Sequence, residues 1–337
     1  VVAFSMTLAR MDRDKQELLY RQLRKIRTVE EAIVAHYPEQ EMRCPVHLCI
    51  GQEAVAAGAC CATNQDDYVL SGHRSHGHYL AKGGDLNSMI SEIYGKANGC
   101  SGGKGGSMHL IDLDVGFLGA VPIVGSTIPM AVGAAMSSRM RGENRISLVF
   151  LGEGATETGV FYESINFASV KNLPIIFVVE NNLYSVYSPL SVRQSGDDRI
   201  VNIAKAHGLD ASRLDGNDVE LVYEHVLQAA KKARNGDGAT LLEFMTYRWR
   251  EHCGPNFDND IGYRSDEEYL QWRERCPVER YTRKLIGDGM FTGDELSQID
   301  AELNDAVVRA FHHAKESPWP EMKELQEHVY AEAAGDT

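Results

Sequence analysis

No stretch of the 337-residue sequence is apolar for long enough to span a lipid bilayer as a helix. Positive charge is also in short supply: 34 lysines and arginines stand against 48 aspartates and glutamates, a formal net charge of −14. An acidic chain repels nucleic acid backbones and anionic membrane surfaces, so we expect neither as a partner. This charge is still compatible with a small anion bound in a local positive pocket.

Two further motifs are missing. The seven cysteines are odd in number and none has zinc-finger spacing, so we expect reduced thiols in a cytoplasmic compartment. No Gly-x-Gly-x-x-Gly turn follows a first strand, which argues against a nicotinamide-binding Rossmann enzyme.

The apolar residues present, 43% of the chain, can fill a large core. Their spacing predicts helices at 12–36, 52–62, 85–94, 126–141, 160–170 and 219–234, and buried strands at 146–151, 174–179 and 240–246. Helices that alternate with buried strands indicate a parallel sheet. We therefore expect one α/β domain over residues 1–337, with helical segments at both ends, residues 1–45 and 266–337.

The strongest functional pattern begins where the first predicted buried strand ends. Gly152-Glu153-Gly154 is followed by a spacer of 26 residues and then by Asn181-Asn182, which ends the next strand. Ligands of parallel sheets bind just beyond the carboxyl ends of strands. Glycines allow close backbone approach, and carboxylate and amide oxygens suit Mg²⁺ or Ca²⁺. Ordinary turn residues are the alternative for each half of the pattern, but their shared context favours a metal-bound diphosphate.

This pattern resembles the thiamin-diphosphate signature, in which Gly-Asp-Gly precedes Asn-Asn by a spacer of this length. The flanking residues 154–157, 161–164 and 173–174 are similar to the α subunits of pyruvate, branched-chain 2-oxo acid and acetoin dehydrogenase E1 components. The resemblance extends from about residue 47 to residue 264. It implies a thiamin-diphosphate-binding α/β fold and an enzyme that decarboxylates a 2-oxo acid and transfers the acyl unit.

The resemblance also implies roles for individual residues. The metal, Mg²⁺ or the larger Ca²⁺, would be bound by Glu153, Asn182 and the backbone carbonyl of Tyr184. Thiamin diphosphate would be bound by His73, Arg74, Val124, Gly152, Gly154, Ala155, Asn182, Arg248 and His252. The catalytic side chains would be His47, His76 and His252, since imidazoles donate hydrogen bonds and move protons near neutral pH.

Three positions depart from the family pattern. Glu153 replaces an aspartate, which extends the carboxylate by one methylene and challenges the strict geometry of Mg²⁺. His73 stands where the family usually has tyrosine, and Cys253 stands where animal pyruvate dehydrogenases carry a regulatory serine. These departures leave the metal and the substrate open.

One required group has no counterpart in the motifs. In the two-subunit E1 family, the carboxylate that activates the cofactor comes from the β subunit. The resemblance therefore implies a β-type partner in an α₂β₂ heterotetramer, a lipoyl-bearing acyltransferase as acceptor and a small 2-oxo acid as substrate. Two other hypotheses stay open: half of a split transketolase-like or carboligase enzyme, and a non-catalytic scaffold homologue.

Overall fold

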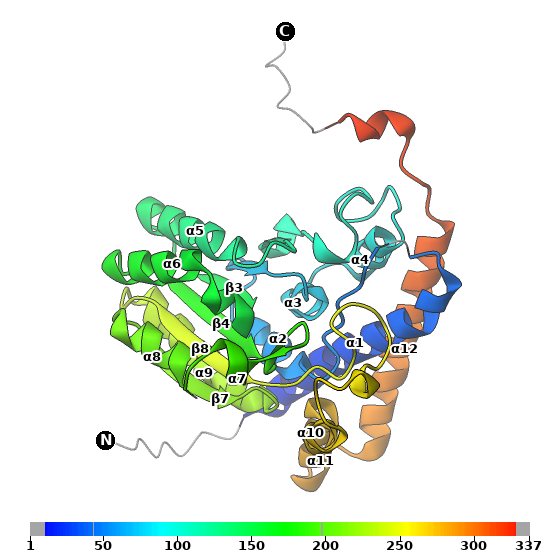
Figure 1. The fold of residues 1–337 in the computed structure, drawn as a ribbon. Coiled ribbons are helices and arrows are strands. Elements are labelled where there is room, and N and C mark those ends of the chain that lie inside the picture. The colour runs from blue at the N-terminus through cyan, green and yellow to red at the C-terminus, as the bar shows by residue number, and fades with distance from the viewer. Residues whose placement is uncertain (1–10, 43, 197, 328–337) are drawn as a thin grey trace, which may run out of the picture.

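The computed structural model describes residues 11–42, 44–196 and 198–327, and its centre is a six-stranded parallel sheet (Figure 1). The strands are β1 (Tyr68–Ser71), β2 (Phe117–Ala120), β3 (Ser147–Gly152), β4 (Ile175–Asn181), β7 (Asp210–Asp215) and β8 (Thr240–Met245), in the order β2-β1-β3-β4-β8-β7. A small antiparallel hairpin, β5 (Tyr184–Ser185) and β6 (Ser188–Pro189), follows β4. The predicted α/β class with a parallel sheet is confirmed.

Helices cover both faces of this sheet. One face packs against α5 (Thr127–Arg141), α6 (Gly159–Val170) and α8 (Arg199–Ala206), and the other against α2 (Glu53–Cys61) and α9 (Val219–Arg234). Successive residues of the strands point to opposite faces, so Leu148 and Phe150 enter one core and Val149 and Leu151 the other. A strand buried on both sides reads as a continuous apolar run, which is why β3 was predictable.

The terminal helices form a separate layer beyond α2. Helix α1 (Arg13–His36) runs beside α12 (Gly293–Glu316), drawn in blue and orange in Figure 1. The remaining helices are α3 (His76–Lys82), α4 (Leu86–Ile93), α7 (Leu190–Arg193), α10 (Asp266–Glu274) and α11 (Pro277–Gly287), with 3₁₀ turns at Tyr37–Glu39, Gly106–Met108, Leu113–Val115, Glu153–Glu157, Asn259–Ile261 and Met322–Leu325. The predicted helical ends are confirmed as far as residues 11–327 are described. No helix in that part of the chain is long and apolar enough to cross a membrane.

The strand order creates a crevice at one edge of the sheet. From β1 the chain first adds β2 on one side and then crosses to add β3 on the other side of β1. Connections that leave neighbouring strands in opposite directions open a space between the loops at their carboxyl ends. The loops after β1 and β3 are the ones that carry Arg74 and Glu153, so the topology brings the two motifs together.

Helices α2 and α9 approach each other closely at Gly58. A Cβ atom at this position would lie 2.8 Å from the carbonyl oxygen of Val219 and 2.8 Å from the Cβ of Val222. Gly133 of α5 differs, because the space around its would-be Cβ is open. The chain itself therefore requires a small residue at Gly58 and not at Gly133.

We predict that Gly58→Ala lowers the free energy of unfolding by about 1–3 kcal/mol, because the added methyl overpacks the helix contact. The matched variant Gly133→Ala should raise it by roughly 0.5–1 kcal/mol, since alanine is the better helix former. Urea denaturation of both variants measures the difference. Equal effects would contradict the close approach of α2 and α9.

Candidate active site

A cavity lies at the carboxyl edge of the sheet, lined by the loops after β1, β2, β3 and β4, by Gln52 before α2 and by His252 after β8. Most of the predicted site residues line it: His73, Arg74, Val124, Gly152, Glu153, Gly154, Ala155, Asn182, Tyr184 and His252. Three predicted residues, His47, His76 and Arg248, are not among the described residues of its wall. The topology thus brings together segments separated by more than half of the chain.

Glu153 is a buried carboxylate of this cavity, with 2% of its surface exposed. Nη2 of Arg193 donates a hydrogen bond to its Oε1 at 2.6 Å. Burial raises the pKa of Glu153 to about 7, and the charge of Arg193 acts in the opposite direction. The carboxyl group therefore exchanges its proton near neutral pH and is ionised above it.

Asn182 provides the second oxygen at the same edge, since β3 and β4 end side by side. Its Nδ2 donates to Oε1 of Gln52 at 3.0 Å, and its Oδ1 accepts from the backbone N–H of Tyr184 at 3.2 Å. These two hydrogen bonds fix which end of the amide is the oxygen. Oδ1 already accepts one hydrogen bond, from the backbone of Tyr184. A carboxylate and an amide oxygen beside a backbone carbonyl are hard donors, a set that fits Mg²⁺ or Ca²⁺.

Arg74, from the loop after β1, supplies positive charge in the same cavity. Its guanidinium donates to the backbone carbonyls of Leu48 at 2.5 Å and His252 at 3.2 Å, and is buried. Burial, then the neighbouring charge of Arg248, lowers the pKa of Arg74 to about 10. Because the guanidinium groups of Arg74 and Arg248 repel each other, an anion bound near them would be favoured. Guanidinium groups also match the geometry of phosphate oxygens.

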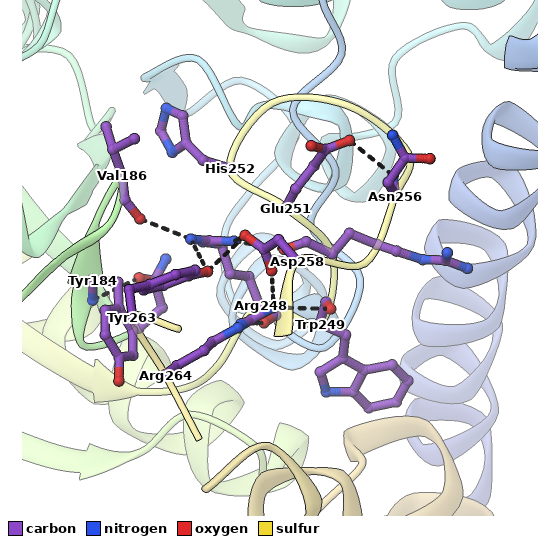
Figure 2. A network of polar contacts seen from close by, with 12 residues as sticks. Tyr184, Val186, Arg248, Trp249, Glu251, His252, Asn256, Asp258, Tyr263 and Arg264 are labelled. Carbon is purple, nitrogen blue, oxygen red and sulfur yellow. Dashed lines mark hydrogen bonds and ion pairs between the residues drawn. The ribbon is translucent and has the colours of Figure 1, made fainter. Parts of the chain in front are cut away.

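Arg248 is not among the described residues that line the cavity, and it holds the segment that follows β8 (Figure 2). It donates to the carbonyl of Val186 at 2.8 Å and to the hydroxyl of Tyr263 at 2.7 Å, and lies 3.4 Å from Asp258. Arg264 forms an ion pair with the same Asp258. The contacts of Arg248 therefore position the loop that carries His252. The side chain of His252 projects away from this network in Figure 2.

Three histidines gather beside Arg74: His47, His73 and His252, with ring centroids 4.7 to 5.3 Å apart. Burial and the charge of Arg74 lower their pKa values to about 2, 3 and 4 respectively, so all three are neutral at pH 7. Their nearest ring nitrogens lie within 4.8 Å, a spacing that a transition metal could draw together. The adjacent guanidinium opposes a cation there, so the cluster suits an anion or a polar substrate group.

His47 and His76 differ in their surroundings. Nδ1 of His47 is buried without a hydrogen-bond partner among the described residues, an unsatisfied polar atom in a ring that lies beside His73 and His252. Both ring nitrogens of His76 are occupied: Nδ1 lies 2.5 Å from Glu30 and Nε2 lies 2.7 Å from Ser107. The fully buried His76 therefore supports the loop structure, and its predicted catalytic role stays a prediction.

Sequence reasoning missed Glu180 and His78, which both line the cavity. Nε2 of His78 lies 3.3 Å from the Glu180 carboxylate, and its Nδ1 lies 2.8 Å from the hydroxyl of Ser71. The ring also stacks on Phe150 at 3.8 Å. The available signal was an acidic residue near the end of a buried strand, since Glu180 immediately precedes Asn181-Asn182.

We predict that divalent cations bind more tightly as the pH rises from 6 to 8. Below its pKa of about 7, Glu153 holds a proton that the cation must displace, so affinity should fall about tenfold per pH unit there. Calorimetric titration of Mn²⁺ into the chain at several pH values measures this slope. Glu153→Gln should bind weakly with little pH dependence, and an unchanged slope in that variant would assign the titration to another group.

Comparison with known proteins finds relatives that match the chain over most of its length. The profile of the dehydrogenase E1 component family matches residues 21–323. The α subunit of acetoin:2,6-dichlorophenolindophenol oxidoreductase from Bacillus subtilis is 36% identical over 319 residues, 94% of either chain. The α subunits of the pyruvate dehydrogenase E1 component from Rhizobium meliloti (36% identical, 95% of this chain and 91% of the relative) and from Porphyra purpurea (35%, 96% and 94%) are similarly close.

Proposed function

Since the chain belongs to the dehydrogenase E1 component family, we propose that it is the α-type subunit of a thiamin-diphosphate-dependent enzyme that decarboxylates a 2-oxo acid and transfers the acyl unit. The observation that carries the proposal is the presence of opposite charges in one cavity. Oxygen donors at Glu153 and Asn182 would face a cation, and the guanidinium of Arg74, which lines the same cavity, would face an anion. A diphosphate that carries a divalent cation is a ligand with both requirements.

The residues of the cavity would bind this ligand as follows. Glu153, Asn182 and the carbonyl of Tyr184 would hold the cation, Mg²⁺ or Ca²⁺, and Arg74 would hold the remaining phosphate oxygens. Gly152 leaves open space where a side chain would extend, which permits close backbone approach. When bound, thiamin diphosphate would supply the nucleophilic carbon and the electron sink for decarboxylation.

The histidine cluster would act on the other end of the ligand. A neutral imidazole donates one hydrogen bond and accepts another, so His47, His73 and His252 can orient a carbonyl oxygen and hold its proton. Burial, and then the charge of Arg74, lowers the pKa of these rings and keeps them neutral, so that they can donate to an oxyanion without the cost of a buried cation pair. Catalytic residues would be His47 and His252, with His73 beside the diphosphate.

A β-type partner would complete the site. Apolar side chains lie exposed around the cavity and on the two helices beside it, with Ile123 72% exposed and Val124, Met130 and Val170 also open to solvent. Exposed apolar side chains of this kind are what a partner chain would cover. A heterotetramer of two α-type and two β-type chains would cover it and add the activating carboxylate, and a lipoyl-bearing acyltransferase would take the acyl unit.

The first test is calorimetric titration of thiamin diphosphate into the chain co-purified with its β-type partner, in Mg²⁺ or Ca²⁺. We expect saturable binding that EDTA abolishes. Arg74→Gln should weaken it at least tenfold, because one charge-assisted phosphate contact is lost, whereas the exposed Arg141→Gln should bind as the wild type does. A folded complex that takes up no cofactor with either metal would leave the non-catalytic scaffold as the better hypothesis.

A second test identifies the substrate class. Relatives are named for acetoin and for pyruvate, so the assay offers the complex acetoin, pyruvate and branched 2-oxo acids in turn. The electron acceptor in the assay is 2,6-dichlorophenolindophenol. We expect dye reduction with a 2-oxo acid by the complex and none by the α-type chain alone. Activity restricted to acetoin, or carbon transfer to an aldehyde without dye reduction, would contradict the proposed substrate class.

A further inference from the structure

The buried carboxylate of Glu153 is held by a partly buried guanidinium, that of Arg193. The two side chains are 2% and 12% exposed, and the contact uses Nη2 of the guanidinium and Oε1 of the carboxylate at 2.6 Å. Burying two charges is costly unless the geometry is good and the remaining donors are satisfied. The contact is therefore a specific feature of this edge of the cavity.

Arg193 approaches Glu153 from outside the cavity. Glu153 lines the cavity, whereas Arg193 is not among the described residues of its wall. Arg193 ends α7, which follows the β5–β6 hairpin, so the segment that begins with Asn182 returns to contact the end of β3. The segment after β4 thus supplies one predicted cation ligand, Asn182, and through Arg193 also binds the other, Glu153.

The guanidinium is fixed on its remaining sides. Nη1 of Arg193 pairs with Glu157 at the far end of the turn that begins with Glu153, and Nε donates to the carbonyl of Ser188 at 3.1 Å. The neighbouring Gln194 donates to Glu157 at 3.0 Å. A planar group held at two of its three nitrogens presents the third, Nη2, to Glu153 in a defined direction.

We propose that Arg193 is a positioning residue, which holds the long side chain of Glu153 by one carboxylate oxygen and directs the other oxygen to the divalent cation of the proposed cofactor. This inference rests on the proposed function. The added methylene of glutamate gives the carboxylate freedom that aspartate lacks, and the arginine removes that freedom. Glu153 and Arg193 thus act as a pair that replaces the shorter acid of the family pattern.

The pairing has a consequence for which cation binds. Mg²⁺ demands near-ideal octahedral geometry, whereas Ca²⁺ accepts varied ligand positions and distances. A residue that only stabilises the fold affects both cations alike. A residue that aims one ligand oxygen affects Mg²⁺ more than Ca²⁺, so the ratio of the two affinities reports positioning.

The opposite role would be competition, in which the guanidinium occupies the carboxylate at the expense of the cation. The two roles predict opposite signs. Removal of a competitor tightens cation binding, whereas removal of a positioning partner weakens it, by about 10–100-fold for residues that orient metal ligands.

The experiment uses the complex with the β-type partner and saturating thiamin diphosphate, titrated with Mg²⁺ or Ca²⁺ and followed by calorimetry and by the shift in melting temperature. We expect Arg193→Ala to weaken Mg²⁺ at least tenfold and Ca²⁺ less, so that the preference moves toward Ca²⁺. Arg193→Lys should recover part of the Mg²⁺ affinity. Arg199→Ala, which alters an arginine bonded to Ser195 and not to Glu153, is the matched control.

A double-mutant cycle completes the test. Glu153→Asp should weaken Mg²⁺ binding, because the shorter acid cannot reach both Arg193 and the cation, and adding Arg193→Ala to it should cost little more. Tighter Mg²⁺ binding in Arg193→Ala, or an unchanged Mg²⁺ to Ca²⁺ ratio, overturns the positioning role but leaves the proposed function intact. A wild-type complex that binds no thiamin diphosphate with either cation overturns both.

Discussion

The divergence of the chain between β1 and β3 is the constraint on which the site depends. Parallel strands must end at the same edge, and the order β2-β1-β3 sends the two connections away from each other. The carboxyl ends therefore border an open crevice that side chains of the loops line rather than fill. Most residues with a proposed role reach this crevice from a strand end, and His47 approaches it from the loop before α2, so the fold positions the chemistry before any ligand contributes.

Charge within the crevice is arranged against the charge of the whole molecule. The chain carries a formal net charge of −14, yet Arg74 and Arg248 lie buried beside three histidines. Burial of the histidines, together with the charge of Arg74, keeps their rings neutral. Concentrating positive potential in a low-dielectric pocket makes it effective there without making the surface basic. The same separation explains why the histidines alone do not make a persuasive metal centre, although their spacing would allow one.

How much was predictable from the sequence follows the physics of burial. Strands β3, β4 and β8 are buried on both faces and appear as apolar runs, and the residues at their ends were predicted with them. The edge strand β7 contains Asp210, Ser212 and Arg213, and β1 and β2 have four residues each, so no periodicity marked them. The family pattern located Arg74 and Asn182 on the cavity but gave no means to separate His47, near the cavity, from His76, bonded between Glu30 and Ser107. Such differences arise from tertiary packing, which motifs do not encode.

The substitution at Glu153 shows how a local departure is absorbed. A lone glutamate in place of aspartate would place a mobile, buried charge where a cation requires fixed geometry. The structure instead pairs it with Arg193, from a loop 40 residues later in the chain, and ties that arginine to Glu157 on the same turn. A non-catalytic scaffold has no use for such a costly pair at the edge of the cavity. The compensation is therefore better explained by a site that still has to hold a cation than by one that has lost the need for it.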